Sequence, residues 1–91
     1  MRTIYKYSKA SCPPCQAFQP VWEEIKKDYK DKDVKFVEIS VDTEDGLEMA
    51  VDRGVSSVPT FLSTDGFRKS GTITKEVFID TFLKHESTYL S

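Results

Sequence analysis

The chain has 91 residues, of which 31% are charged, and 13 basic against 15 acidic residues give a net charge of −2. This length suits a single domain over residues 1–91 with a modest core. No apolar run approaches the roughly 20 residues that span a bilayer, and the interspersed charges form no basic patch of the kind that binds nucleic acid. The N-terminal residues lack the pattern of a signal peptide, so we expect a cytoplasmic protein.

The first part of the chain predicts a strand followed by a helix. β-branched and aromatic residues from Thr3 to Tyr7 indicate a short strand. A helix is expected from Pro13, because apolar side chains then recur at spacings of three and four. We expect Ser11 to cap this helix, prolines to occupy its first turn, and Pro20 to kink it. Its apolar stripe consists of Phe18, Val21, Trp22, Ile25 and Tyr29.

A second strand and a short helix follow a charged turn at residues 30–33. The run from Val34 to Val41 predicts a largely buried strand. We expect Thr43 to cap the next helix and Gly54 to end it, while Gly46 weakens it near its start. The apolar residues of this helix are Leu47, Ala50 and Val51.

The last part of the chain predicts a hairpin and a final helix. Short β-like runs at Thr60–Ser63 and Phe67–Ser70 flank the pair Asp65-Gly66, which is a strong hairpin signal. Thr74 is expected to cap the final helix, and the tail from His85 is expected to fray. The side chains expected to face the core are Phe78, Phe82 and Leu83.

The predicted order is strand, helix, strand, helix, strand, strand, helix, which indicates an α/β fold. The first two strands and the helix between them make a βαβ unit, so these strands should be parallel. The hairpin strands must be antiparallel to each other. A mixed four-stranded sheet with helices on both faces satisfies every amphipathic element.

The only two cysteines, Cys12 and Cys15, stand at the junction of the first strand and helix, separated by Pro13 and Pro14. A two-residue spacer lets two thiols form and break a disulfide, whereas a structural bridge over so short a loop would stabilise weakly. Unpaired N–H groups of the first helical turn favour a thiolate, and Lys9 lies close in sequence. We therefore expect Cys12 to be the nucleophile and Cys15 the more covered, resolving thiol.

Other kinds of site have less support in the sequence. A metal site is not expected, because the two cysteines supply only two ligands and His85 lies far along the chain. Exposed apolar residues around the cysteines form a candidate docking patch for partner proteins. Its members are Ala10, Pro13, Pro14 and Val58.

Taken in order, these motifs resemble the thioredoxin superfamily over nearly the whole chain. Each motif alone is weak, and the series is fairly specific. The series comprises Cys12-Pro13-Pro14-Cys15, Pro20, Arg53-Gly54, Val58-Pro59-Thr60, Asp65-Gly66, Gly71 and Thr74.

The resemblance implies a minimal thioredoxin fold and an electron-transporting thiol–disulfide oxidoreductase that reduces protein disulfides. Its active-site loop would consist of Ser11, Pro13 and Pro14 between and beside the two catalytic cysteines. We expect a monomer that needs no bound cofactor and takes electrons from a partner reductase or from glutathione. The resemblance further implies a cis peptide bond between Val58 and Pro59. Pro59 would face the cysteine loop, while the Val58 backbone would hydrogen-bond an incoming peptide strand.

Two departures from the family leave alternatives open. Lys6 occupies the position of a buried aspartate that assists proton transfer at the second cysteine. We expect its ammonium to extend to solvent, and the alternative is that it favours a thiolate electrostatically. The segment Ser57-Val58-Pro59 approaches the Thr-Val-Pro of glutaredoxins, so a glutathione-dependent reductase is the alternative enzyme. A thioredoxin-fold binding module is the non-enzymatic alternative.

Overall fold

The computed structural model describes residues 2–83, and its elements follow the predicted order. Helix α3 continues directly into a π-helical turn, η1, and the tail from His85 lies outside the described residues. The bounds are β1 Arg2–Ser8, α1 Pro13–Asp28, β2 Val34–Ser40, α2 Glu44–Asp52, β3 Thr60–Ser63, β4 Arg68–Ser70, α3 Lys75–Phe78 and η1 Ile79–Leu83.

The four strands form one mixed sheet in the order β2-β1-β3-β4, which confirms the predicted architecture. Strand β1 pairs in parallel with β2, while β3 is antiparallel to both β1 and β4. The parallel pairing places the segments that follow β1 and β2 at one edge of the sheet. Because Tyr7 lies opposite Thr60, the segment that precedes β3 reaches the same edge.

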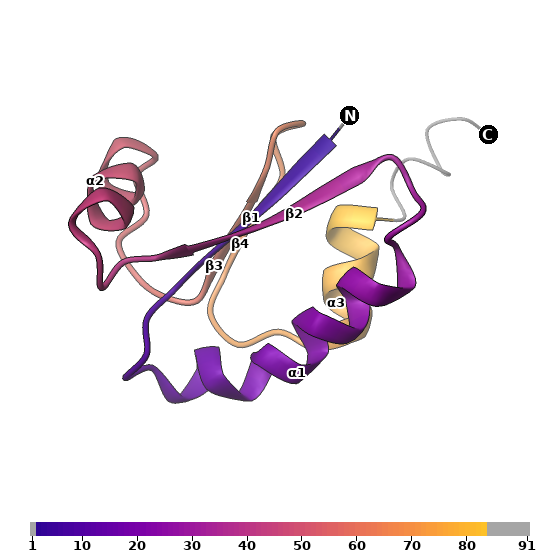
Figure 1. The fold of residues 1–91 in the computed structure, drawn as a ribbon, viewed down its shortest axis with the longest axis horizontal. Coiled ribbons are helices and arrows are strands. Elements are labelled where there is room, and N and C mark those ends of the chain that lie inside the picture. Colours follow the sequence, from indigo (N-terminus) through magenta and orange to yellow (C-terminus); the bar gives the residue numbers. More distant parts are fainter. Residues whose placement is uncertain (1, 84–91) are drawn as a thin grey trace.

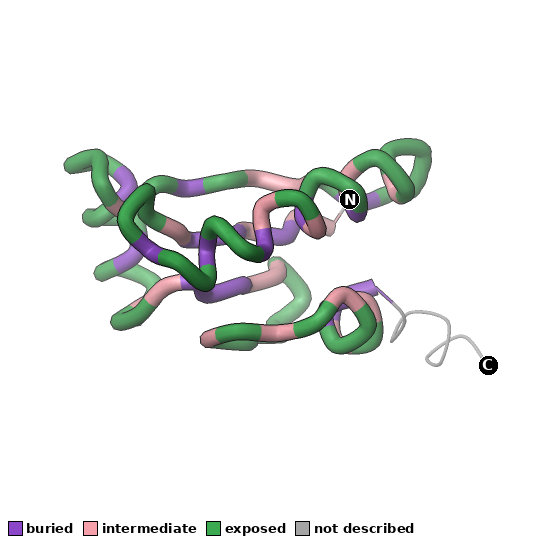
Figure 2. Tube along the Cα trace, turned by 90° about the horizontal axis from the view of Figure 1, so that it is seen from below, coloured by how far each residue is buried: buried purple, intermediate pink, exposed green. Residues whose placement is uncertain are grey.

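The main core lies between the sheet and the two helices on one of its sides, α1 and α3 (Figure 1). Buried and exposed stretches alternate along the chain (Figure 2), and the buried residues of α1 are Cys15, Phe18, Trp22 and Ile25. The Phe78 ring is fully buried, with centroids of four other aromatic rings 4.9–5.9 Å away. The inward orientation predicted for Phe78, Phe82 and Leu83 is confirmed. The buried cluster consists of Ile4, Phe18, Trp22, Ile25, Val34, Phe61, Phe78, Phe82 and Leu83.

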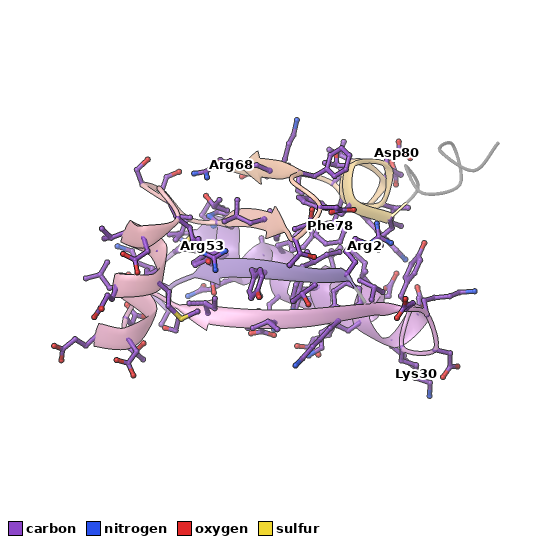
Figure 3. The ribbon with its side chains drawn as sticks, turned by 90° about the horizontal axis from the view of Figure 1, so that it is seen from above. Arg2, Lys30, Arg53, Arg68, Phe78 and Asp80 are labelled. Carbon is purple, nitrogen blue, oxygen red and sulfur yellow. A yellow bond between two sulfur atoms is a disulfide. The ribbon has the colours of Figure 1, made fainter. Side chains whose placement is uncertain are left out.

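Helix α2 covers the other face of the sheet at one end only (Figure 3). A smaller cluster of Tyr7, Ile39 and Ala50 is buried there. Arg68 reaches from β4 to the end of α2 and donates to the carbonyl oxygens of Arg53 at 3.1 Å and Gly54 at 2.7 Å. These bonds tie the hairpin to the C-terminal end of α2.

The burial of β2 differs from the prediction, and α2 leaves most of its apolar residues exposed. Strand β2 ends at Ser40, and only Val34 and Ile39 are buried in it, because β2 is an edge strand that α2 covers only partly. Of the three apolar residues expected on α2, only Ala50 is buried, while Leu47 and Val51 expose 53% and 67% of their surface. The helix packs through its smallest side chains, which allows a close approach to the sheet.

Gly46 makes that close approach possible. A Cβ atom at this position would lie 1.8 Å from the carbonyl oxygen of Ser40, so any side chain would collide with the backbone. The predicted cap is present, because Thr43 Oγ1 accepts from the Gly46 N–H at 2.9 Å. Gly54 follows the last helical residues with a φ of 70°, as expected of a glycine that ends a helix.

Thr74 caps α3 as predicted, with its Oγ1 accepting from the Val77 N–H at 3.1 Å. The predicted hairpin turn is also confirmed, and Gly66 has a φ of 96° there. No helix within residues 2–83 is long and apolar enough to cross a membrane.

Candidate active site

The loop after β1 meets the segment before β3 at one edge of the sheet. Cys12 lies in this loop, and its Sγ is 3.7 Å from the carbonyl oxygen of Val58. The Val58–Pro59 peptide bond is cis, and the Pro59 side chain is fully buried. The structure therefore brings together the two motifs that the sequence separates by more than forty positions.

Cys12 and Cys15 form a disulfide, with their Cα atoms 5.2 Å apart. Cys12, and not Ser11, takes the N-cap position of α1. Pro13 and Pro14 occupy the first two helical positions and have no N–H group, so the first donor of the helix is Cys15. Its N–H donates to Cys12 Sγ at 3.2 Å.

The prediction that Ser11 caps the helix is therefore wrong, and the reason is the proline pair. With two donors missing, the Cys15 N–H is the only donor of the first turn that bonds the Cys12 side chain, while the Gln16 N–H makes the first regular helical bond, to the Cys12 carbonyl oxygen at 3.0 Å. A thiolate at Cys12 would accept the Cys15 hydrogen bond and the favourable end of the helix dipole.

The two cysteines differ little in burial. Cys12 exposes 6% of its surface and Cys15 exposes 4%, so Cys15 is only slightly more buried than Cys12 in the oxidised form. The segment at Val58 and Pro59 covers Cys12 from the β3 side. Around them, Pro13 and Pro14 are exposed.

Hydrogen bonds from three directions hold the active-site loop. The Cys12 N–H donates to the carbonyl oxygen of Lys9 at 3.3 Å. The Ala10 N–H donates to Asp42 Oδ2 at 2.8 Å, and the Gln16 side-chain amide donates to the Ala10 carbonyl oxygen. Sequence reasoning missed Asp42, although an acidic residue just after β2 was predictable at this edge of the sheet.

Lys6 is fully buried, so the prediction that its ammonium extends to solvent is wrong. Its Nζ donates to Gln19 Oε1 and lies 3.8 Å from Glu38 Oε2. It also lies 5.1 Å from the centroid of the Trp22 ring. Successive side chains of β1 point to opposite faces of the sheet, so Lys6 points to the α1 side and its neighbours Tyr5 and Tyr7 to the other. On the α1 side, Gln19, Glu38 and Trp22 stabilise the ammonium charge.

The network around Lys6 shifts the ionisation of its charged members. Burial lowers the pKa of Lys6, and the charge of Glu38 partly offsets this effect. Burial also acts to raise the pKa of Glu38, but a hydrogen bond from Gln19 and the charge of Lys6 hold it below the usual range. Sequence reasoning identified Lys6 but did not find Gln19 or Glu38, since no local pattern marks either residue.

Two hollows flank the cysteines. A shallow hollow is lined in part by Cys15, and the side chains of Gln16, Gln19 and Asp42 contribute polar groups to its lining. An apolar groove lies on the other side and joins the active-site loop to the start of α3. Its lining includes Pro14, Ala17, Phe18, Val21, Pro59 and Ile73.

Comparisons with known proteins agree on one family. The thioredoxin family model matches residues 2–84. The chain is 34% identical over 80 residues to the M-type chloroplastic thioredoxin of Chlamydomonas reinhardtii, a match that covers 88% of the chain and 55% of that relative. It is 38% identical over 74 residues to thioredoxin Asp f 29 of Aspergillus fumigatus, with 81% of the chain and 62% of that relative covered.

The same fold is found in solved structures. The crystal structure of oxidised thioredoxin O2 from Arabidopsis thaliana superposes with a TM-score of 0.73 over 90% of this chain and 75% of that one, at 20% identity. The likeness at this identity shows the fold. The chain spans 55% and 62% of the lengths of the two curated relatives. These matches favour a thioredoxin over the glutaredoxin-like alternative.

Proposed function

Since this chain belongs to the thioredoxin family, we propose that it is a thiol–disulfide oxidoreductase that reduces protein disulfides through Cys12 and Cys15. The observation that carries the proposal is the disulfide at the start of α1, with the Cys15 N–H directed at Cys12 Sγ. A helix start of this kind lowers the pKa of a thiol, which favours the attacking thiolate.

The reaction proceeds in two exchanges. The Cys12 thiolate attacks a substrate disulfide, so that a Cys12–substrate bond forms and the other substrate sulfur leaves as a thiolate. The Cys15 thiolate then attacks Cys12, which forms the Cys12–Cys15 disulfide and releases the second substrate thiolate. The substrate gains two electrons, and the two leaving thiolates take protons from water. The Cα separation of 5.2 Å supports the second exchange without backbone movement.

The surroundings of the disulfide support a protein as the substrate. Pro13, Pro14 and Ala10 are exposed and Val58 is partly buried, so an apolar rim surrounds the cysteines. The apolar groove beside Pro14 and Pro59 offers further contact area for an extended segment of the partner. In this arrangement the Val58 backbone would pair with the segment that carries the substrate disulfide.

A disulfide reductase needs an electron donor, and we propose a thioredoxin reductase in a reducing compartment such as the cytosol. The protein would act as a monomer, with residues 1–91 as one domain. No bound cofactor is required, because both electrons are carried by the two sulfur atoms.

The test is reduction of insulin disulfides with either thioredoxin reductase and NADPH or glutathione and glutathione reductase. The wild type should turn over with the first system. Cys12→Ser should abolish turnover, while Cys15→Ser should accumulate a mixed disulfide that mass spectrometry detects. Activity that survives in Cys12→Ser would refute the role of Cys12, and failure of the wild type with dithiothreitol as donor would refute the proposed function.

A further inference from the structure

Lys6 is the only charged residue that is buried among residues 2–83. Burial of an ammonium group is unfavourable unless it is paired, and methionine would fill a similar space without a charge. The polar partners of Lys6 are Gln19 and Glu38, and Glu38 still exposes 39% of its side chain. The ammonium is therefore held in a dry position that core packing alone does not require.

The position of Gln19 connects Lys6 to the resolving cysteine. Gln19 follows Cys15 by four residues in α1, so the two side chains lie on the same face, about one turn or 5.4 Å apart along the axis. Both line the same hollow beside the active-site loop. Because Lys6 Nζ donates to Gln19 Oε1, the buried charge contacts a residue that lines the same hollow as Cys15.

The two ends of the Gln19 side-chain amide contact groups of opposite charge. Its oxygen faces Lys6, while its Nε2 donates to Glu23 Oε2 at 2.9 Å and Glu38 Oε1 at 3.3 Å. Both carboxylates are exposed, so water screens them, whereas Lys6 is not in contact with water. The charged groups that face the network and the hollow are Glu23 and Lys26 of α1, Glu38 of β2, and Lys9 and Asp42 of the flanking loops.

We propose that Lys6 is a positioning residue that favours the thiolate of Cys15 through its buried positive charge, and this rests on the proposed function. Cys15 loses its proton to water in the hollow that it lines, and its thiolate then attacks Cys12 in the mixed disulfide. The Cys12–Cys15 bond forms, the Cys12–substrate bond breaks, and the substrate leaves as a thiolate. Lys6 neither gives nor takes a proton in this step. It acts through the field at Cys15 and through the Gln19 side chain that it orients.

The test compares Lys6→Met with Lys35→Met, a matched control that removes an exposed lysine from β2. In a Cys12→Ser background, the ultraviolet absorbance of the thiolate reports the pKa of Cys15. Lys6→Met should raise this pKa so that the thiolate population at neutral pH falls about tenfold, equivalent to about 1.4 kcal/mol. With both cysteines present, release of substrate from the mixed disulfide should slow by a similar factor. The control should change neither quantity.

A third measurement isolates the first exchange. In a Cys15→Ser background, Lys6→Met should change the rate of mixed-disulfide formation less than twofold, because Cys12 depends on the start of α1 for its charge. An unchanged Cys15 pKa and release rate in Lys6→Met would overturn the inference while leaving the proposed function intact. If Lys6→Met fails to fold, the Cys12→Ser protein decides: a Cys15 pKa at or above the ordinary value of about 8.5 overturns the inference, and a lower value supports it.

Discussion

Replacement of Gly46 by alanine tests how tightly α2 is seated on the sheet. On helix propensity alone, the change should stabilise the protein by about 1 kcal/mol. The structure predicts the opposite sign. The new Cβ would lie 1.8 Å from the Ser40 carbonyl oxygen and 2.8 Å from Thr43 Oγ1, so the start of α2 must move away from the end of β2.

The size of the effect follows from the contacts that this movement breaks. Thr43 Oγ1 donates to the Ser40 carbonyl oxygen at 3.0 Å and accepts from the Gly46 N–H at 2.9 Å. The Thr43 N–H also donates to Ser40, at 3.4 Å. Loss of the cap and of the two bonds to Ser40 costs about 1 kcal/mol each. After the gain in propensity, we expect a net destabilisation of about 2 kcal/mol.

Urea unfolding of the oxidised protein measures this difference. With a slope of about 1–3 kcal/mol/M for a small protein, the midpoint should fall by roughly 1 M. Glu48→Ala, at an exposed position of the same helix, is the control and should change stability by less than about 0.5 kcal/mol. A Gly46→Ala protein as stable as the wild type would refute the close contact between α2 and Ser40.

Two further predictions concern the ion pair and the core. Burial acts to raise the pKa of Glu38, but the Gln19 hydrogen bond and the Lys6 charge outweigh this effect and hold the pKa below its ordinary value of 4.5. The ionised Glu38 therefore stabilises the folded protein above pH 4.5, and this stabilisation is lost as the pH falls through the lower pKa of the folded state. The urea midpoint of Glu38→Gln should therefore fall less between neutral and acidic pH than that of the wild type. An equal fall in the two proteins would contradict the ion pair between Glu38 and Lys6. Phe78→Ala should cost about 3–5 kcal/mol, since the ring is fully buried among four others. Val77→Ala, at a half-exposed neighbour, should cost far less in the same assay, and equal losses would argue against the ring cluster.

Much of the fold was predictable from the sequence because its signals are local. The spacing of Phe18, Trp22 and Ile25 reports one face of a helix wherever that helix packs. Thr43 and Thr74 cap their helices through bonds to N–H groups three residues away, and Gly66 supplies a backbone conformation that its own turn requires. These interactions need no knowledge of the rest of the chain.

The candidate site was predictable in part for the same reason. Cys12 and Cys15 are close in sequence, so their pairing follows from a short loop at a strand–helix junction. The approach of Val58 and Pro59 was expected only from the resemblance to a family. The prediction of a Ser11 cap was wrong because Pro13 and Pro14 have no N–H group that Ser11 could bond. The first available N–H belongs to Cys15, and it donates to the sulfur of Cys12.

Only the tertiary structure decided the features that depend on distant neighbours. The charge of Lys6 is buried because Gln19 and Glu38, from two other elements, stabilise it there. Gly46 is required because the backbone of Ser40 occupies the space of a side chain, and β2 is half-exposed because it lies at the edge of the sheet. Propensities and caps act within a few residues, whereas burial and close contacts are set by segments that meet only when the chain folds.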